Sequence, residues 1–263
     1  MKIGFFDSGI GGLAVLNRAL TILPNEDYVY YADVDHVPYG TKTKEQIIKF
    51  ADNAVQFLTA HDVKAIVVAC NTATSVAIGY LREKYRIPIL GMEPAVKPAV
   101  EHKGGGRVLV IATPLTTREA KLKNLICAVD TENKVDIHPI SGLVTFAENG
   151  EFDSPAVEAY LKKELEGYNL SDYSELVLGC THFNYFKDTY AKIFPPGTEF
   201  IEGSVGTVKH LRNILSERNL LENNGGNVEY YYSGRRIKDG EEKQKIDKLL
   251  LRLDKMRNID RCI

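Results

Sequence analysis

Two cysteines stand out because each follows a short apolar segment and precedes a threonine. Cys70 lies in VVACNTAT and Cys180 in LVLGCTHF, so both segments run apolar strand, small residue, cysteine and then threonine within two positions. Both cysteines also come just before a predicted helix, where the helix dipole and the free N–H groups lower a thiol pKa and favour the thiolate. The pattern therefore predicts two reactive thiols, against the alternative of two buried structural cysteines.

Polar residues accompany these cysteines. His182 comes two residues after Cys180, and Asp7 ends another apolar segment, so an imidazole and a carboxylate are candidates to take or give a thiol proton. Hydroxyl and amide side chains follow the same segments and could hold carboxylates together with the N–H groups at helix starts. These side chains are Ser8, Asn71, Thr72 and Thr181. The turns after these strands contain no lysine, so they offer no candidate for a Schiff base to pyridoxal phosphate.

Alternating strands and helices must position these residues. Short β-branched segments predict strands at 2–6, 28–33, 64–69, 88–91, 107–113, 135–140, 175–179, 198–201 and 228–233. Amphipathic segments predict helices at 10–22, 43–60, 73–85, 116–128, 142–149, 154–166, 183–193, 204–219 and 240–256. This alternation indicates an α/β fold with mostly parallel sheets flanked by helices, in which ligands bind at the carboxyl ends of the strands.

The chain length suits one large or two medium domains, since it has 263 residues. Pro94, Pro98 and the glycines 104–106 mark one predicted boundary, and residues 202–204 mark a second one where the chain crosses back. We expect two pseudo-symmetric lobes with the active site in the cleft between them. The first lobe would comprise residues 1–95 plus 205–263, and the second residues 96–204.

Composition excludes several classes of protein. A net charge of −2 argues against a nucleic-acid groove, and 44% hydrophobic residues argue for a folded chain. No apolar segment is long enough for a membrane helix, and the N-terminus does not look like a signal peptide, so we expect a cytoplasmic protein. Its cysteines would then be free thiols. We expect Cys127 to be a packing residue and Cys262 to have no role.

Four short blocks resemble a known family. FDSGIGG, the PYG turn at 38–40, ACNTAT at 69–74 and GCTHF at 179–183 together look like glutamate racemase, within the cofactor-independent two-cysteine aspartate/glutamate racemases. The resemblance extends to about residue 233. It implies a racemase that interconverts L- and D-glutamate, small-molecule substrates, without cofactor or metal. It also implies a supply of D-glutamate for peptidoglycan, and hence a role in the bacterial cell wall and cell shape. We further expect a homodimer.

The resemblance also implies roles for individual residues. The substrate α-carbon would lie between two sulfurs, with Cys70 acting on the D-isomer and Cys180 on the L-isomer. Asp7 would assist the first cysteine and His182 the second. The positions that match substrate contacts are Asp7, Ser8, Tyr39, Gly40, Asn71, Thr72, Thr181 and His182. Glu148, in FAENG, is a further candidate because family members often carry an acid there.

Other functions remain open at this point. The substrate could be aspartate or another acidic amino acid, since one methylene is worth only about 1–3 kcal/mol in a pocket. Gly9, Gly11 and Ala14 fit a dinucleotide-binding loop, with Asp33 about twenty residues on, which would indicate an oxidoreductase. A metal site could use Asp7, Cys70, Cys180 and His182. A module that binds an acidic amino acid without turnover is a further alternative. The charged segment 239–257 predicts a solvated amphipathic helix or a partner surface.

Overall fold

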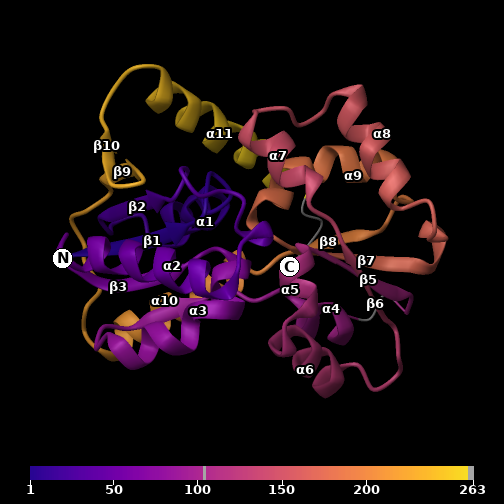
Figure 1. Cartoon of the computed structure of the whole chain (residues 1–263), viewed down its shortest axis with the longest axis horizontal. Helices are drawn as coiled ribbons and strands as arrows, with labels where there is room; N and C mark the ends of the chain where they lie inside the picture. The colour runs from indigo at the N-terminus through magenta and orange to yellow at the C-terminus, as the bar shows by residue number, and fades with distance from the viewer. Residues whose placement is uncertain (103–104, 260–263) are drawn as a thin grey trace.

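The computed structural model describes residues 1–102 and 105–259, so Cys262 lies outside the described residues. Two sheets with helices on both faces organise the chain (Figure 1). The predicted α/β class is confirmed. The six-stranded sheet has the order β10 (Arg235–Ile237), β9 (Val228–Tyr232), β2 (Tyr28–Ala32), β1 (Lys2–Asp7), β3 (Val63–Val68) and β4 (Ile89–Gly91). The four-stranded sheet has the order β6 (Val135–Pro139), β5 (Arg107–Ala112), β7 (Tyr173–Gly179) and β8 (Glu199–Ile201).

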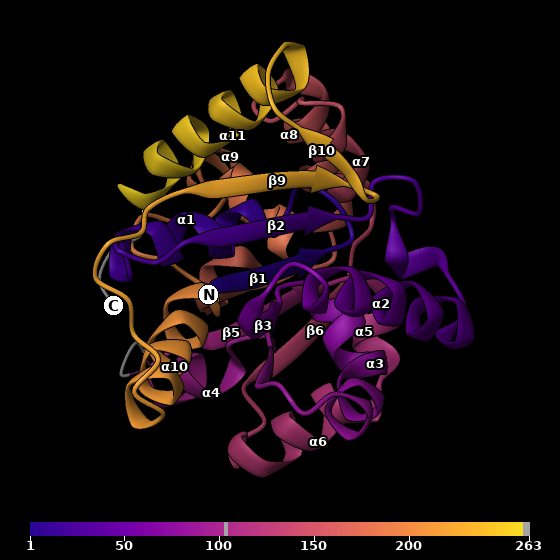
Figure 2. The ribbon, with the colours of Figure 1, turned by 90° about the vertical axis from the view of Figure 1, so that its left-hand side faces the viewer.

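The strands of the six-stranded sheet are apolar on both faces because helices cover both. Phe5 and Phe6 of β1 are neighbours in the chain, so their side chains enter different cores on opposite faces. Phe5 packs with α1 (Leu13–Ile22), α10 (Ser204–Glu217) and α11 (Glu241–Arg257). Phe6 packs with α2 (Lys44–Thr59) and α3 (Asn71–Lys84). Figure 2 shows β9, β2, β1 and β3 lying side by side in this order.

The four-stranded sheet is parallel throughout and is also covered on both faces. One face packs against α4 (Val96–Glu101) and α6 (Ala120–Val129). The other face packs against α7 (Gly142–Glu148), α8 (Pro155–Glu164) and α9 (Lys187–Ile193). Within residues 1–102 and 105–259, the remaining elements are α5 (Pro114–Arg118) and the 3₁₀ helices η1 (Tyr39–Thr41), η2 (Leu170–Asp172) and η3 (Thr181–Phe186). We call the part built on the six-stranded sheet, with its helices, the first lobe and the part built on the four-stranded sheet the second lobe.

Side-chain caps start several of the helices. Thr43 and Gln46 form a capping box at the start of α2, in which each side chain bonds the backbone N–H of the other. Ser154 caps α8, and Pro155 occupies its first position, where a missing N–H costs nothing. These local signals explain why the predicted helix starts at 43 and 154 fall within one residue of the observed ones.

Several elements differ from the sequence prediction. The helix predicted at 116–128 is two helices, because Glu119 between α5 and α6 is extended and its carboxylate faces Lys44 of α2 at 2.9 Å. The helix predicted at 183–193 begins earlier, as η3. Helix α4 and strand β10 were not predicted. Strand β10 pairs antiparallel with β9 across a two-residue turn of Ser233 and Gly234, both with positive φ, which is a hairpin signal that the sequence contained.

The lobes share a core and two adjacent chain crossings. One apolar cluster contains residues of α1 and α11 together with residues of α7, α8 and α9. The chain leaves the first lobe after β4 and returns after β8, and these passes touch, since a Cβ on Gly203 would lie 2.9 Å from the Glu93 carbonyl oxygen. Helix α11, yellow in Figure 1, runs from β10 towards α7 of the second lobe.

None of the helices within the described residues is both long enough and apolar enough to cross a membrane.

Candidate active site

The carboxyl ends of β1 and β3 bring three predicted site residues together. Cys70 follows β3 and caps α3, accepting a hydrogen bond from the Ala73 N–H at 3.4 Å. Its thiol donates to the Ser8 hydroxyl at 3.6 Å, and Ser8 follows Asp7 at the end of β1. Cys70 is only 5% exposed and Asp7 is fully buried. The first lobe therefore supplies a sulfur, a hydroxyl and a carboxyl group to one buried point.

The predicted lowering of the Cys70 pKa is wrong for this structure. Burial, together with the charge of Asp7, raises the pKa of the Cys70 thiol to about 12, although the hydrogen bonds with Ala73 and Ser8 act to lower it. A helix start stabilises a thiolate only where solvation does not dominate, and a sulfur buried beside a carboxylate is the opposite case. Cys70 is thus a neutral thiol.

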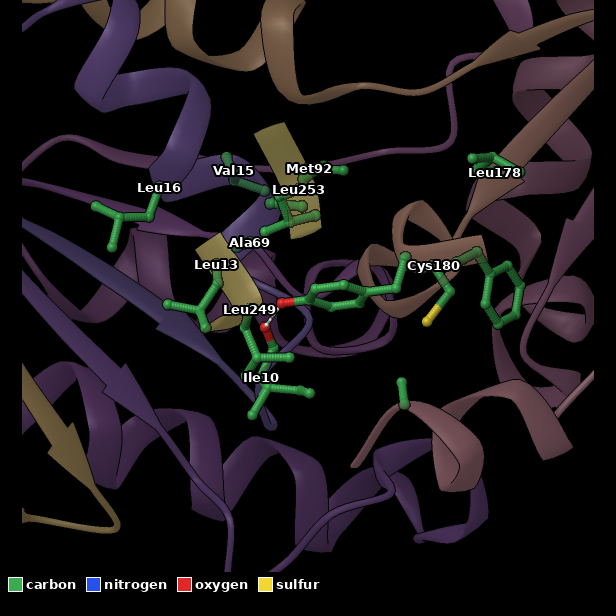
Figure 3. Packing of buried hydrophobic residues seen from close by; sticks show 14 of the residues in the cluster. Ile10, Leu13, Val15, Leu16, Ala69, Met92, Leu178, Cys180, Leu249 and Leu253 are labelled. Atoms are coloured by element: carbon green, nitrogen blue, oxygen red, sulfur yellow. Dashed lines mark hydrogen bonds between the residues drawn. The ribbon is translucent and has the colours of Figure 1, made fainter. Parts of the chain in front are cut away.

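The carboxyl end of β7 supplies the second sulfur. Cys180 is 7% exposed, and its Sγ lies 3.8 Å from Nδ1 of His182, the second residue of η3. The other ring nitrogen of His182 lies 2.7 Å from Oε1 of Glu148 at the end of α7. The same Oε1 accepts the N–H of Ile10 at 2.9 Å. Figure 3 shows Cys180 in the same apolar cluster as Ile10 and as Leu249 and Leu253 of α11.

His182 and Glu148 form a charged pair. Burial by itself lowers the pKa of His182, but its hydrogen bonds and charge interactions with Cys180 and Glu148 outweigh burial and raise that pKa well above its usual value. For Glu148, burial acts to raise the pKa, yet the bonds from His182 and Ile10 bring it below its usual value. Both pKa shifts favour the charged forms of the two side chains, so His182 is an imidazolium that lies between the Glu148 carboxylate and the Cys180 sulfur.

A hydrogen bond joins the two halves of the site. The Thr181 hydroxyl donates to Oδ2 of Asp7 at 3.1 Å, while the Gly9 N–H donates to Oδ1 at 2.9 Å. Burial raises the pKa of Asp7 to about 6, although the charge of His182 and both hydrogen bonds oppose this rise. Asp7 can therefore change protonation near neutral pH, next to both halves of the site.

The glycine loop after β1 is occupied by side chains of the second lobe. A Cβ on Gly9 would lie 1.9 Å from Oε1 of Glu148, and a Cβ on Gly11 would lie 2.4 Å from both Nδ1 of His182 and Oγ1 of Thr181. A dinucleotide-binding loop needs this space for a pyrophosphate. The alternative of a dinucleotide-binding oxidoreductase is therefore not supported. Asp33 also has other partners, since it accepts the Tyr39 hydroxyl at 2.6 Å.

The remaining predicted site residues lie around this centre. Asn71 donates its amide N–H to the Met92 carbonyl at 3.2 Å, and its buried Oδ1 finds no hydrogen-bond partner among the described residues. The Thr72 hydroxyl lies 3.0 Å from that of Thr113 and 3.2 Å from that of Thr116, so it links the lobes. Tyr39 and Gly40 form η1, and a Cβ on Gly40 would lie 3.1 Å from Thr113.

A cavity of about 330 Å³ lies beside this threonine group. Its lining comes from both lobes and includes Gly40, Lys42, Thr113, Arg118, Ser141 and Val144. Sequence reasoning did not find Thr113 and Thr116, although Thr113 directly follows β5, which is the kind of strand end that drew attention to the other residues.

Two further expectations can be compared with the structure. Cys127 is exposed, so the expectation of a packing residue is wrong. Leu122 is the buried residue of α6, and five residues further along a helix the side chain points to the other side. Among the described residues, no three His, Cys, Asp or Glu side chains are placed to share a metal ion, so the metal alternative lacks a ligand set there.

Comparisons with known proteins place the chain in a family. The family described as Asp/Glu/Hydantoin racemase matches residues 12–211. A glutamate racemase of Lachnospira eligens is 53% identical over 98% of this chain and 100% of its own length. The structure of Francisella tularensis glutamate racemase in complex with D-glutamate has a TM-score of 0.79, 31% identity, and coverage of 95% of this chain and 93% of that one.

A second solved structure shows the same arrangement at lower identity. Escherichia coli glutamate racemase, in complex with L-glutamate and the activator UDP-MurNAc-Ala, has a TM-score of 0.77 and 25% identity, and the match covers 90% of this chain and 99% of that one. The family match, the full-length relatives and the two-sulfur site agree: the chain belongs to the Asp/Glu/hydantoin racemase family.

Proposed function

We propose that the chain is a glutamate racemase that interconverts L- and D-glutamate by proton transfer at the α-carbon between two cysteines. One observation carries this proposal. Cys70 with Ser8 and Cys180 with His182 stand at strand ends of different lobes, and the bond from Thr181 to Asp7 joins them. The relatives named above are glutamate racemases, which favours glutamate over aspartate as the substrate.

Inversion at the α-carbon needs two groups on opposite faces. A single base that removes and returns the proton on one face would give back the same enantiomer. One cysteine, as thiolate, takes the α-proton, and the other, as thiol, gives its own proton to the opposite face. The proton balance is kept, since one sulfur gains the α-proton of the substrate while the other sulfur gives a different proton to the α-carbon, and the reverse reaction restores the starting state.

On the second lobe, Cys180 acts on the L-isomer. The His182 ring beside its sulfur can supply a proton to that sulfur as an imidazolium and receive one as a neutral imidazole. Glu148 holds the imidazole in place from its other nitrogen.

On the first lobe, Cys70 acts on the D-isomer. Its neutral thiol is the proton donor when L-glutamate is the substrate. Asp7 assists by changing protonation near neutral pH, and Ser8 receives the thiol hydrogen bond. A positioned acid or base of this kind typically contributes about 10²–10⁴-fold in rate.

Polar groups around the sulfurs bind the substrate. The unpartnered Oδ1 of Asn71 is an acceptor suited to the α-ammonium group. The hydroxyls of Ser8 and Thr72 can donate to carboxylates, as can the backbone N–H groups near Tyr39, Gly40 and Thr181. These assignments complete the predicted substrate contacts, with Asp7, His182 and Glu148 shaping the pocket.

The proposal extends to the setting of the reaction. The chemistry uses side chains only, without cofactor or metal, and the product D-glutamate serves peptidoglycan synthesis in the cytoplasm. The protein acts as a homodimer. The lobes that enclose the substrate comprise residues 1–95 plus 205–263 and residues 96–204.

The deciding experiment follows the α-proton by NMR. The chain is incubated in D₂O without added cofactor, with L-glutamate in one sample and L-aspartate in another. We expect deuterium at the α-carbon and loss of optical activity with glutamate, and little of either with aspartate.

Variants separate this mechanism from the alternatives. Cys70→Ala and Cys180→Ala should each abolish racemisation, while the exposed Cys127→Ala is the matched control and should keep it. Binding of glutamate without exchange would indicate the binding module, and exchange with aspartate alone would move the substrate to the shorter acid. Near wild-type racemisation by either active-site alanine variant would refute the two-cysteine mechanism.

A further inference from the structure

The turn that carries Thr181 and His182 is held from one side by the C-terminal helix. In η3, hydrogen bonds inside the turn run from the Phe183 N–H to the Cys180 carbonyl and from the Asn184 side chain to the Thr181 carbonyl, at 3.1 Å each. Such short 3₁₀ segments have poorer internal hydrogen bonds than an α-helix. The position of η3 therefore depends on what packs against it.

Arg252 of α11 makes the polar contacts to the end of this turn. Its Nε donates to the carbonyl of Tyr185 at 2.9 Å, and its Nη2 lies 2.9 Å from both carboxylate oxygens of Asp188. Its guanidinium also lies over the ring of Phe152, at 4.7 Å from the ring centre. The Arg252 side chain is 15% exposed. A planar, partly buried fork of this kind fixes both the backbone of η3 and the first turn of α9.

The same turn contacts the glycine loop. The Tyr185 hydroxyl donates to the Ile10 carbonyl at 3.0 Å, and Ile10 also donates its N–H to Glu148. A shift of η3 would thus move His182 relative to both Cys180 and Glu148. Lys245 lies seven residues before Arg252, on the same face of α11, and donates to the Glu148 carbonyl at 2.9 Å. Helix α11 therefore also contacts the backbone of the residue whose carboxylate pairs with His182.

We propose that Arg252 is a positioning residue for the Cys180 side of the site. It acts through η3 and sets the distance between the His182 imidazole and the Cys180 sulfur. This inference rests on the proposed function, because it takes Cys180 and His182 as a proton-transferring pair. Among the described residues, Arg252 is the arginine of α11 that faces η3.

Arg257 offers a matched control on the same helix. It lies five residues further along, and its hydrogen bonds go to Asn17 and Thr21 of α1 and to Asp254 of α11. Arg257→Gln therefore removes an arginine that anchors α11 to the first lobe, whereas Arg252→Gln removes one that anchors η3. A general loosening of α11 would affect both variants.

The test measures activity and cysteine reactivity in parallel on the full chain. The variants are Arg252→Gln, Arg252→Lys and Arg257→Gln, with thermal unfolding recorded for each. Because enantiomers have equal free energies, kcat/KM must fall equally in both directions, so it cannot report which side of the site changed. The rate of alkylation of Cys180 relative to Cys70 by iodoacetamide, read from peptide masses, reports the side directly.

We expect Arg252→Gln to lower kcat/KM by about tenfold or more, since a misplacement of about 1 Å can cost about 10²-fold. The alkylation ratio of Cys180 to Cys70 should fall, because a displaced imidazole no longer lies beside the Cys180 sulfur to take its proton as the sulfur is alkylated. Arg252→Lys keeps the positive charge but not the planar guanidinium with its several donors. Its kcat/KM and its alkylation ratio should therefore lie between those of Arg252→Gln and wild type. Arg257→Gln should stay within about twofold of wild type in both quantities.

Two results would overturn the inference. One is an Arg252→Gln variant with wild-type kcat/KM and an unchanged alkylation ratio. The other is a loss of activity in the Arg252→Gln variant in which Cys70 and Cys180 change reactivity together, so that their alkylation ratio stays at the wild-type value. Failure of the proposed function looks different, because the wild-type chain would then not racemise glutamate even though the alkylation ratio still responded to Arg252.

Discussion

The two cysteines of the site stand in opposite electrostatic surroundings. Cys70 caps an α-helix and faces a hydroxyl and a buried carboxyl group, and burial raises its pKa to about 12. Cys180 stands at the start of a 3₁₀ turn beside an imidazolium that Glu148 holds from behind. Similar sequence segments, each an apolar strand followed by a cysteine and a threonine, thus lead to two different acid–base groups.

This difference matches what a racemase requires at any one moment. One sulfur must hold a proton and the other must accept one, so identical surroundings would favour the same state for both. Under the proposed mechanism, the thiol of Cys70 is the proton donor and Cys180, paired with His182, is the base when L-glutamate is the substrate. The opposite direction needs a proton to move from the first side to the second, and Asp7 lies between them.

The largest effect should come from changing one sulfur at a time to oxygen. Cys70→Ser and Cys180→Ser should each lower racemisation by about 10³-fold, because a serine hydroxyl is a much weaker acid and base. Cys70→Ser keeps the Cys180 side, so α-deuterium exchange in D₂O should persist with L-glutamate only. Cys180→Ser should show exchange with D-glutamate only. Exchange with the same enantiomer in both variants would contradict the assignment of Cys180 to the L-isomer and Cys70 to the D-isomer.

The next effect concerns the imidazole that distinguishes the second side. His182→Asn should lower kcat by about 10²–10³-fold, because it removes the group that exchanges the Cys180 proton. Glu148→Gln should have a smaller effect and should lower the pKa of His182, which loses the charge that raises it. The measurement is the titration of the imidazole by NMR. An unchanged His182 titration in the Glu148→Gln variant would mean that the pair does not couple.

The buried Asp7 on the Cys70 side of the site should make the free energy of unfolding depend on pH. The folded-state pKa of Asp7, about 6, lies above its ordinary value of 3.8, so the folded chain binds the extra proton between about pH 4 and pH 6. The free energy of unfolding therefore falls as pH rises through this window, by about 3 kcal/mol in total from this residue. In urea unfolding, the Asp7→Asn variant should lack this fall of the free energy of unfolding between about pH 4 and pH 6.

Asp27→Asn is the control for this slope. The pKa of Asp27 is lowered by hydrogen bonds from Asn227, so its contribution to stability has the opposite sign with pH. A wild-type slope in the Asp7→Asn variant would show that the buried carboxyl group titrates as an ordinary one.

The smallest effect should come from the glycine loop that both sides contact. A Cβ at Gly11 meets His182 and Thr181 at 2.4 Å, so Gly11→Ala should cost about 1–3 kcal/mol and reduce kcat as well. Gly79 lies in α3 with no atom within 4 Å of such a Cβ, and Gly79→Ala should stabilise the chain by about 0.5–1 kcal/mol. Urea unfolding compares the two. If Gly11→Ala and Gly79→Ala changed the free energy of unfolding equally, the glycine loop would accommodate the added methyl group without displacing Thr181 and His182.

Local patterns predicted the parts of the site that local physics determines. Apolar strands and the polar residues at their ends can be read from the sequence, because strand burial and parallel topology bring those ends to one edge. Asp7, Cys70, Thr181 and His182 were found in this way, and all four lie in the hydrogen-bonded centre.

Contacts between distant elements could not be predicted in the same way. Glu148 meets Ile10 across 138 residues of sequence, and Arg252 meets Tyr185 across 67, so only packing decides these pairs. The pKa of Cys70 depends in the same way on burial, which a helix start does not reveal. For Cys127, the pattern gave the helix but not the side that faces solvent.

The order of the strands has a consequence for how the chain is made. The four-stranded sheet uses one continuous stretch of residues, 107–201, whereas the six-stranded sheet lacks β9 and β10 until residues 228–237 have been synthesised. During translation the second sheet can pair its strands while the first is still missing an edge. Helix α11 follows still later, and with it Arg252. Both cysteines are therefore synthesised before α11, the helix that contacts η3 through Arg252. Catalytic activity would then develop only after the rest of the chain has folded.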